Sequence, residues 1–178
     1  MKYLVTGHTG FKGSWLVALL KMQGHEVHGI ALQPEKNSHF NKSGITKFLD
    51  SNTYLDIRLR DELDKKIAEI SPEIVIHLAA QPLVRYSYKF PVETYETNVL
   101  GTLNLLEAIK NLPNLRAALI ITTDKVYKNK NQLTGYKESD ELGGDDPYSS
   151  SKAAADIASQ SWRKSFGTFP IAIARAIS

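Results

Sequence analysis

Short apolar runs alternate along the chain with stretches in which apolar residues recur at helical spacing. The run at 74–78 is apolar except for His77, as expected for a strand covered on both faces of a parallel sheet. This alternation predicts an α/β fold with a doubly wound parallel sheet of about six strands and helices on both faces. The predicted strands are 2–6, 26–32, 52–57, 74–78, 117–122 and 169–176.

Apolar spacing also predicts helices between these strands. The first helix ends at Gly24, and its apolar face consists of Phe11, Trp15, Leu16, Leu19 and Leu20. The second carries Leu63, Ile67 and Ile70 and stops at Ser71-Pro72. The third has one long face made of Val92, Tyr95, Val99, Leu103, Leu106 and Ile109. The fourth begins at Pro147 and ends at Gly167. The stretches 34–50 and 127–146 are polar and irregular, and a loop as long as the second is usually functional or disordered.

Composition narrows the class of protein. The 178 residues suit one domain, and 42% hydrophobic and 23% charged residues are ordinary values for a globular chain. A net charge of +3 with scattered lysines gives no basic stripe, so no nucleic-acid partner is expected. The chain has no cysteine, and we predict no metal site. No apolar run reaches the roughly 20 residues that span a bilayer. Because the first residues already form a strand, no signal peptide is predicted, and a cytoplasmic location is the default expectation.

Three glycines follow the first strand at a spacing of three residues. Gly7 would let the chain turn with an unusual φ, Gly10 would let a diphosphate approach the backbone, and Gly13 would let the helix pack closely. Such a turn places free N–H groups of a helix start against a phosphate, as in Rossmann-type dinucleotide sites. An ordinary strand-to-helix turn is an equally good reading of the glycines alone.

Further candidate cofactor residues stand at other strand ends. The second strand ends in Ala31-Leu32-Gln33-Pro34-Glu35, without the acidic residue that usually binds the adenine ribose. The sequence therefore does not decide whether the cofactor is NAD or NADP. Asp56 and Ile57 could bracket an adenine, with the carboxylate accepting from the amino group and Ile57 covering a ring face. Ala79 and Ala80 leave space for a flat ring or a ribose. His77 is interpreted as a core histidine, and Asn98 either binds backbone or is exposed.

A second constellation lies later in the chain. Tyr148 and Lys152 are four residues apart, so they share one helix face. A nearby ammonium would lower the pKa of the phenol and make it a base near neutral pH. Thr123, at the end of the fifth strand, could hydrogen-bond the same oxygen and orient a substrate.

Together these residues resemble the extended short-chain dehydrogenase/reductases, and within them the nucleotide-sugar 4,6-dehydratases that act on CDP-glucose. The resemblance rests on the glycine turn through Leu16, on 77–88, on Pro91-Val92-Glu93-Thr94 with Asn98-Val99-Leu100-Gly101-Thr102, and on Gly143-Gly144 with Asp146-Pro147-Tyr148. The triplet Thr123-Asp124-Lys125 is its sharpest discriminator.

The resemblance implies a bound NAD and a reaction in which the sugar is oxidised at C4, loses water across C5 and C6, and is reduced at C6. Tyr148 would take the 4-hydroxyl proton, and Asp124 and Lys125 would supply the acid and base of the elimination. The implied cofactor positions are Gly7, His8, Thr9, Gly10, Phe11, Gly13, Asp56, Ile57, Leu78, Ala79, Ala80, Asn98, Tyr148 and Lys152. The His8 side chain would donate to the diphosphate or help hold the nicotinamide, or else face solvent.

Members of this family are about twice as long as this chain, and their later half supplies most of the substrate pocket. We therefore expect one NAD-binding domain over 1–178, with the substrate lobe absent and cofactor binding better retained than catalysis. A homodimer is plausible. The alternatives are an epimerase or reductase of the same superfamily, and a non-catalytic dinucleotide-binding module.

Overall fold

The computed structural model describes residues 1–166 and 170–176. Within them a six-stranded parallel sheet has the order β3-β2-β1-β4-β5-β6. The strands are β1 (Lys2–Thr6), β2 (Glu26–Ala31), β3 (Ser51–Tyr54), β4 (Ile74–His77), β5 (Ala117–Thr123) and β6 (Ile171–Ala176). This is the Rossmann strand order, with its switch point between β1 and β4. The predicted fold class is therefore confirmed.

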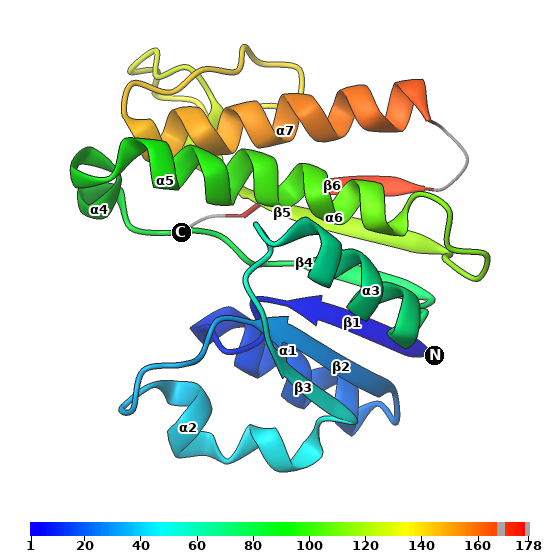
Figure 1. The fold of residues 1–178 in the computed structure, drawn as a ribbon. Helices are drawn as coiled ribbons and strands as arrows, with labels where there is room; N and C mark the ends of the chain where they lie inside the picture. The colour runs from blue at the N-terminus through cyan, green and yellow to red at the C-terminus, as the bar shows by residue number, and fades with distance from the viewer. Residues whose placement is uncertain (167–169, 177–178) are drawn as a thin grey trace.

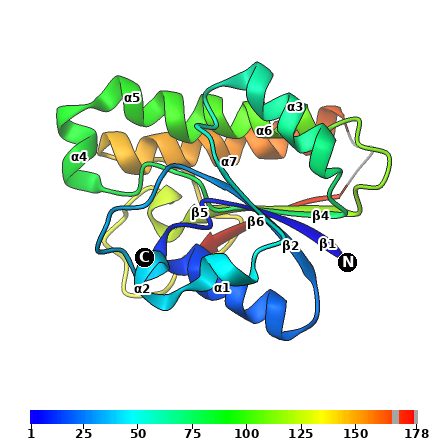
Figure 2. The ribbon, with the colours of Figure 1, turned by 60° about the horizontal axis from the view of Figure 1, so that its bottom comes forward.

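Helices cover the sheet on both faces (Figures 1 and 2). On one face lie α1 (Phe11–Met22) and α2 (His39–Ser43), and on the other α3 (Arg60–Ile70), α6 (Gly101–Ile109) and α7 (Pro147–Ser165). Successive residues of a strand point to opposite faces, so Leu4 joins the core under α3 and α6 while Val5 joins the core under α1. The predicted end of the last helix at Gly167 and the predicted strand start at 169 fall outside the described residues.

The predicted apolar face of α1 is only partly confirmed, because Leu20 is buried and Leu16 packs against the core, whereas Phe11, Trp15 and Leu19 are exposed. Phe11 is 67% exposed and Trp15 57% exposed, and the buried residues of the helix are Gly13, Ser14, Val17 and Leu20. The glycine turn brings the start of α1 so close to the sheet that small side chains must face inward, and this rotates the larger ones outward. His39 packs against the exposed rings of Phe11 and Trp15.

The stretch 34–50 is more regular than its composition predicts. It contains α2 and a 3₁₀ turn at Ile45–Phe48, separated by Gly44 with φ +67°. Ser38 caps α2 by accepting from the N–H of Asn41 at 3.3 Å. Phe40 and Ile45 are buried and complete the core beneath α1.

The third predicted helix corresponds to the last three of four successive elements. Two short helices, α4 (Val84–Lys89) and α5 (Pro91–Tyr95), precede a π-helical turn, η2 (Glu96–Leu100), which runs into α6. The predicted face holds only in α6, where Leu106 and Ile109 are buried and Leu103 packs against the core. Before that, Thr94 and Asn98 face inward, and Val92, Tyr95 and Leu100 are exposed. A π turn shifts the side chains that follow it around the helix axis, which separates the two faces.

Candidate functional site

The carboxyl ends of the strands gather most of the predicted site residues at one edge of the sheet, where open α/β sheets bind ligands. The glycine turn follows β1, residues 78–80 follow β4, and Thr123-Asp124-Lys125 follows β5. Tyr148 comes in from the first turn of α7, which begins at the same edge. Lys12 in α1 is close enough to Lys152 in α7 for its charge to lower the pKa of Lys152, so the two helix starts lie near each other.

Two glycines of the turn are required by its geometry. Gly7 has φ +73°, and a Cβ there would stand 2.6 Å from the backbone nitrogen of Ala79. A Cβ on Gly13 would collide with the carbonyl oxygen of Gly7. The turn therefore packs directly against the segment that follows β4, and the unusual φ predicted for Gly7 is confirmed.

Gly10 has a different environment, and it bears on whether a dinucleotide fits. A Cβ on Gly10 would meet only the Gly7 carbonyl oxygen within 4 Å, at 3.3 Å, so the space outside it is open. Gly10 is the N-cap of α1 and supplies no side-chain cap, and the first turn of the helix has no acidic residue. The first N–H groups of a helix have no partner within it, so this end fits an anionic diphosphate. Thr9 is tied down, because its hydroxyl donates to the Leu32 carbonyl at 3.1 Å.

The side chain of His8 lies in neither of its predicted places. It is fully buried beneath the turn, its ring lies against Gly29 where any Cβ would clash, and Nε2 is 2.8 Å from Asn52 Oδ1. Burial lowers the pKa of His8, although hydrogen bonds to the acceptors Asn52 and Ile30 act in the opposite direction. Only the backbone of His8 therefore remains at the ligand edge.

Asp56 and Ile57 lie in different environments, although the sequence predicted that both would contact an adenine. Ile57 is buried under α6, where the missing Cβ of Gly101 makes room for its side chain, so it covers no ligand ring. The Asp56 carboxylate remains near the edge and is held by Arg58, whose Nη2 donates to Oδ2 at 2.7 Å. Burial alone would raise the pKa of Asp56, but the hydrogen bonds from Arg58 outweigh burial and lower it.

The buried Asn98 fixes the segment after β4. Its Oδ1 accepts from the N–H of Gln81 at 2.8 Å, and its Nδ2 donates to the Gln81 carbonyl at 3.2 Å and to Ser151 Oγ at 2.9 Å. Ser151 in turn donates to the carbonyl of Tyr148 at 2.7 Å. Asn98 thus joins the β4 loop to the start of α7 from the π turn, which confirms the backbone-binding interpretation.

A second buried chain of hydrogen bonds runs through His77. The Thr6 hydroxyl accepts from the N–H of Ala79 at 3.3 Å and lies 2.6 Å from His77 Nδ1. His77 Nε2 lies 3.0 Å from Thr102 Oγ1, and Thr102 donates to the Asn98 carbonyl at 2.7 Å. Burial, with a smaller contribution from the Lys152 charge, lowers the pKa of His77 to about 3. His77 is therefore a neutral core residue, as interpreted from the sequence.

Tyr148 meets Thr123 as predicted, but its acidity differs from the prediction. Burial raises the pKa of Tyr148, the hydrogen bond with Thr123 lowers it, and the carboxylates of Asp124 and Asp146 raise it further. Lys152 donates instead to the Ile121 carbonyl at 3.1 Å. The expectation of a phenol made acidic by the ammonium is wrong in this state of the protein, because the sequence pattern cannot include the desolvation of the phenolate.

Lys152 itself is the more perturbed partner. It is buried on the inner side of α7, and burial together with repulsion from Lys12 lowers its pKa to about 8. A buried cation beside a helix start is a local positive field, which favours an anionic ligand. The same cation is unfavourable for folding when no anion is bound.

Asp124 and Lys125 begin a short 3₁₀ turn, η3 (Asp124–Val126), directly after β5. Both side chains are partly exposed, with Lys125 Nζ 3.8 Å from Asp124 Oδ1, so they can reach a ligand. Thr123 is buried, and its hydroxyl donates to Asp124 Oδ1 at 3.0 Å. The three residues therefore form one connected group at the edge.

Several structurally important residues were not predicted from the sequence. Ser87 of α4 accepts from the backbone N–H of Tyr148 at 3.1 Å and so places the start of α7. Buried Asp156 pairs with Arg175 of β6 at 2.9 Å. Arg175 also donates to Tyr127 Oη at 2.9 Å and to the Glu138 carbonyl at 3.0 Å, which holds the loop at 127–146. These contacts join distant segments, so no local pattern could have revealed them.

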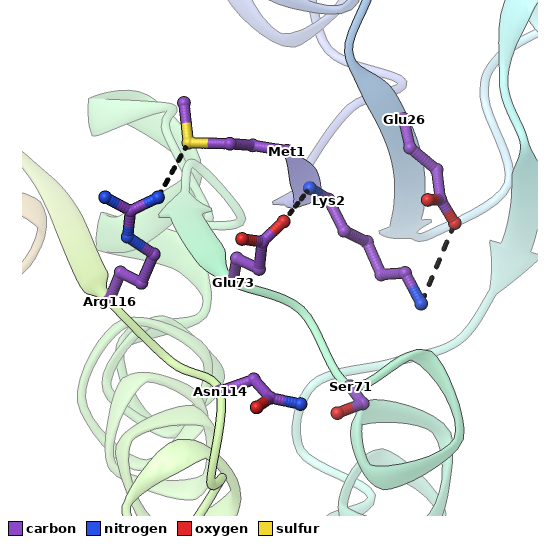
Figure 3. A pocket seen from close by; sticks show the side chains of 7 residues that line it. All are labelled: Met1, Lys2, Glu26, Ser71, Glu73, Asn114 and Arg116. Carbon is purple, nitrogen blue, oxygen red and sulfur yellow. Dashed lines mark hydrogen bonds and ion pairs between the residues drawn. The ribbon is translucent and has the colours of Figure 1, made fainter.

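One cavity lies beside this edge of the sheet, and another lies away from it. One of about 720 Å³ runs from Asp124 along β6 and is lined also by Tyr127, Tyr136 and Arg175. The other, of about 460 Å³, opens at the amino ends of the strands, where Glu73 accepts from the backbone N–H of Lys2 at 2.7 Å (Figure 3). No predicted site residue lines the second cavity.

Within 1–166 and 170–176, no helix combines the length and apolar character needed to cross a membrane. The same residues contain no cluster of three His, Asp or Glu side chains suited to a metal ion.

Comparisons with known proteins agree with this geometry. CDP-glucose 4,6-dehydratase of Salmonella typhimurium is 48% identical over 166 residues, which cover 93% of this chain and 46% of that protein. The structure of Pal from Bacillus thuringiensis has a TM-score of 0.87 at 29% identity, over 98% of this chain and 55% of that one. DesIV of Streptomyces venezuelae, a dTDP-glucose 4,6-dehydratase with NAD bound, has a TM-score of 0.86 at 26% identity, again over 98% and 55%.

The chain therefore spans about half the length of the relatives it matches. The predicted resemblance to nucleotide-sugar 4,6-dehydratases is confirmed. A family model described as GDP-mannose 4,6 dehydratase matches residues 4–176, and the chain belongs to that family.

Proposed function

We propose that this chain is the cofactor-binding part of an NAD-dependent nucleotide-sugar 4,6-dehydratase that converts CDP-glucose to CDP-4-dehydro-6-deoxyglucose and water. The observation that carries the proposal is the convergence of the open glycine turn, the Thr123-Asp124-Lys125 group and Tyr148 at one edge of the sheet. The 48% identity to a CDP-glucose 4,6-dehydratase supports the choice of sugar nucleotide.

The chain's own residues fit NAD. The open face of Gly10 and the uncapped start of α1 would take the diphosphate, the small side chains of Ala79 and Ala80 leave room beside it, and Asp56 would accept from the adenine amino group. DesIV, which shares this fold, contains NAD. When bound, NAD supplies a hydride acceptor at C4 of the sugar and later a hydride donor at C6.

Tyr148 and Thr123 would act on the 4-hydroxyl group. Their hydroxyls are within hydrogen-bond reach of each other, so a sugar hydroxyl that replaces this contact could give its proton to the Tyr148 oxygen. This phenol is protonated near neutral pH, and burial raises its pKa further, so the Lys152 ammonium, together with the positive charge that bound NAD would supply, would have to favour the phenolate.

Asp124 and Lys125 would carry out the elimination of water. Once C4 is a ketone, the C5 proton is acidic, and one group of the pair removes it while the other protonates the departing C6 hydroxyl. Both side chains are partly exposed at the edge and lie 3.8 Å apart at their charged atoms. Such a pair can hold one proton-accepting and one proton-donating group against adjacent carbons.

The test is turnover of CDP-glucose that carries deuterium at C4, followed by mass spectrometry and NMR of the product. A dehydratase delivers that deuterium to C6 with loss of one water, and this result supports the proposal. Deuterium returned to C4 with inversion would indicate an epimerase. Binding of NAD without turnover would leave only the dinucleotide-binding module, and absence of both would refute the whole assignment.

A homodimer is part of the proposal. Exposed apolar side chains gather on α5, η2 and α7, which pack against one another, and they include Val92, Tyr95, Leu100 and Ile157. Contiguous exposed apolar surface of this kind marks interaction sites. Light scattering should give a dimer that the Leu100→Asp substitution dissociates, while Leu133→Asp, in the loop at 127–146, leaves it intact. A monomeric parent chain would refute the dimer.

A further inference from the structure

Arg58 makes an unusually complete contact with Asp56. Its Nε donates to both carboxylate oxygens, at 3.1 and 3.0 Å, its Nη2 donates to Oδ2 at 2.7 Å, and its backbone N–H donates to Oδ1 at 2.9 Å. The side chain of Asp56 is 20% exposed, and that of Arg58 is 34% exposed. A planar guanidinium that meets both oxygens fixes the rotation of a carboxylate as well as its position.

The other side of Arg58 faces two acidic side chains on α5 and on the π turn η2. Its Nη1 lies 3.8 Å from Glu93 Oε1 in α5 and 3.7 Å from Glu96 Oε2 in η2. Tyr86 Oη donates to Glu93 Oε2 at 2.9 Å, which orients that carboxylate. Three acidic side chains therefore surround one guanidinium and restrict its movement.

The backbone around Asp56 is clamped independently. Asn104 of α6 donates to the carbonyls of Ile57 and Arg58, at 3.0 and 3.3 Å. Ile57 is buried under the same helix at Gly101. The backbone is thus fixed by α6, and the remaining freedom of Asp56 is the rotation of its side chain, which Arg58 controls.

We propose that Arg58 is a positioning residue that orients the Asp56 carboxylate to read the 6-amino group of a bound adenine. The proposal rests on the binding of NAD proposed above. An ionised carboxylate only accepts hydrogen bonds, so it favours the 6-amino donor of adenine and disfavours a base with a carbonyl oxygen at that position. Because the guanidinium occupies one side of both oxygens, the carboxylate presents its remaining lone pairs in a fixed direction.

The test compares the affinity of the 178-residue chain for NAD with its affinity for nicotinamide hypoxanthine dinucleotide, measured by calorimetry. The two ligands differ only in that the second has a carbonyl oxygen in place of the 6-amino group. We expect the parent chain to prefer NAD by about tenfold or more, as for a hydrogen bond to a charged group. Asp56→Asn should abolish this preference, because an amide can satisfy either base.

Two substitutions of Arg58 separate orientation from charge. Arg58→Met should reduce the preference for NAD to within about twofold, and Arg58→Lys should do the same because an ammonium cannot hold both oxygens. Arg60→Met is the matched control: Arg60 lies two residues away, is also ion-paired, to Asp64 and Glu107, and should leave the preference unchanged. Urea unfolding of each variant checks that the fold is intact.

The outcomes are distinct. Equal losses of affinity for both dinucleotides in Arg58→Met would mean a merely structural role and would overturn the inference. A full preference retained by Arg58→Lys would also overturn it, since charge neutralisation alone would then suffice. If Asp56→Asn changes nothing while the parent binds NAD, adenine recognition by Asp56 fails but the proposed function stands. If the parent binds neither dinucleotide, both proposals fall.

Discussion

The replacement of Lys152 by methionine should stabilise the protein near neutral pH while it removes a residue needed at the site. Lys152 is buried in α7, and its pKa is lowered from 10.5 to about 8 by burial and by repulsion from Lys12. Below that value the folded protein holds an ammonium that the unfolded chain would solvate better. Methionine has a similar stem and no charge, so it removes the penalty.

The size of the effect follows from the pKa shift. Each unit corresponds to about 1.4 kcal/mol, so the charged lysine destabilises the folded state by about 3 kcal/mol at neutral pH. The lost hydrogen bond from Nζ to the Ile121 carbonyl offsets about 1 kcal/mol of the gain. Lys152→Met should therefore raise the free energy of unfolding by about 2 kcal/mol.

The dependence on pH distinguishes this cause from better packing. A group with a lowered pKa in the folded state loses its proton first there, so the penalty on the parent protein shrinks as pH rises from about 8 to 10.5. The lysine penalty should fall from about 3 kcal/mol at pH 7 to about half that value at pH 9.5. Urea unfolding at the two pH values measures the difference between parent and variant. Lys65→Met, on the exposed side of α3, should show the same small difference at both. A Lys152→Met variant less stable than the parent at pH 7, or a gap that does not change with pH, would refute the reasoning.

Three further predictions concern other parts of the site. His77 has a pKa of about 3, below its unfolded value of 6.5, so the free energy of unfolding should fall as pH falls below 6.5. Urea unfolding should show a loss of about 2 kcal/mol between pH 7 and 5, which His77→Gln should remove. An unchanged loss in that variant would contradict the prediction. Gly7→Ala should destabilise the protein by more than about 3 kcal/mol in thermal melts, because φ is +73° and the added Cβ would meet backbone atoms. Gly24→Ala has a similar φ of +77° but open space around it, so it should lose only about 1 kcal/mol. Similar losses in the two variants would contradict the crowding at Gly7. If the chain turns over CDP-glucose, Tyr148→Phe should lower kcat by about 10² to 10⁴ without weakening NAD binding in calorimetry, and a smaller effect would exclude the phenol as the base.

Sequence reasoning succeeded where a local pattern has a single physical solution. The strands and the doubly wound class follow from the alternation of apolar runs and helices, and the roles of Gly7 and Gly13 follow from the turn that they must make. The approach of Thr123 to Tyr148 also follows, because the carboxyl end of β5 and the start of α7 must meet at one edge.

The failures come from tertiary packing that local spacing cannot contain. Phe11 and Trp15 turned outward because the glycines bring α1 too near the sheet for large side chains. Ile57 turned inward because Gly101, far along the chain, vacates the space it fills. His8 and Tyr148 were misread for a related reason: their burial, which decides where His8 points and how acidic Tyr148 is, depends on neighbours from other elements.

The buried hydrogen bonds through His77 have only one workable direction. Thr102 gives its only proton to the Asn98 carbonyl, so it must accept from His77, and the ring hydrogen sits on Nε2. The bare Nδ1 of the neutral ring then accepts from the Thr6 hydroxyl, which itself accepts from the N–H of Ala79. Each member passes on one proton and receives one, with none to spare in a dry interior. Substitutions at positions 6, 77 and 102 are therefore coupled. A side chain that can only donate or only accept, placed at one of these positions, leaves its neighbour without a hydrogen-bond partner, so tolerated substitutions must change the affected positions together.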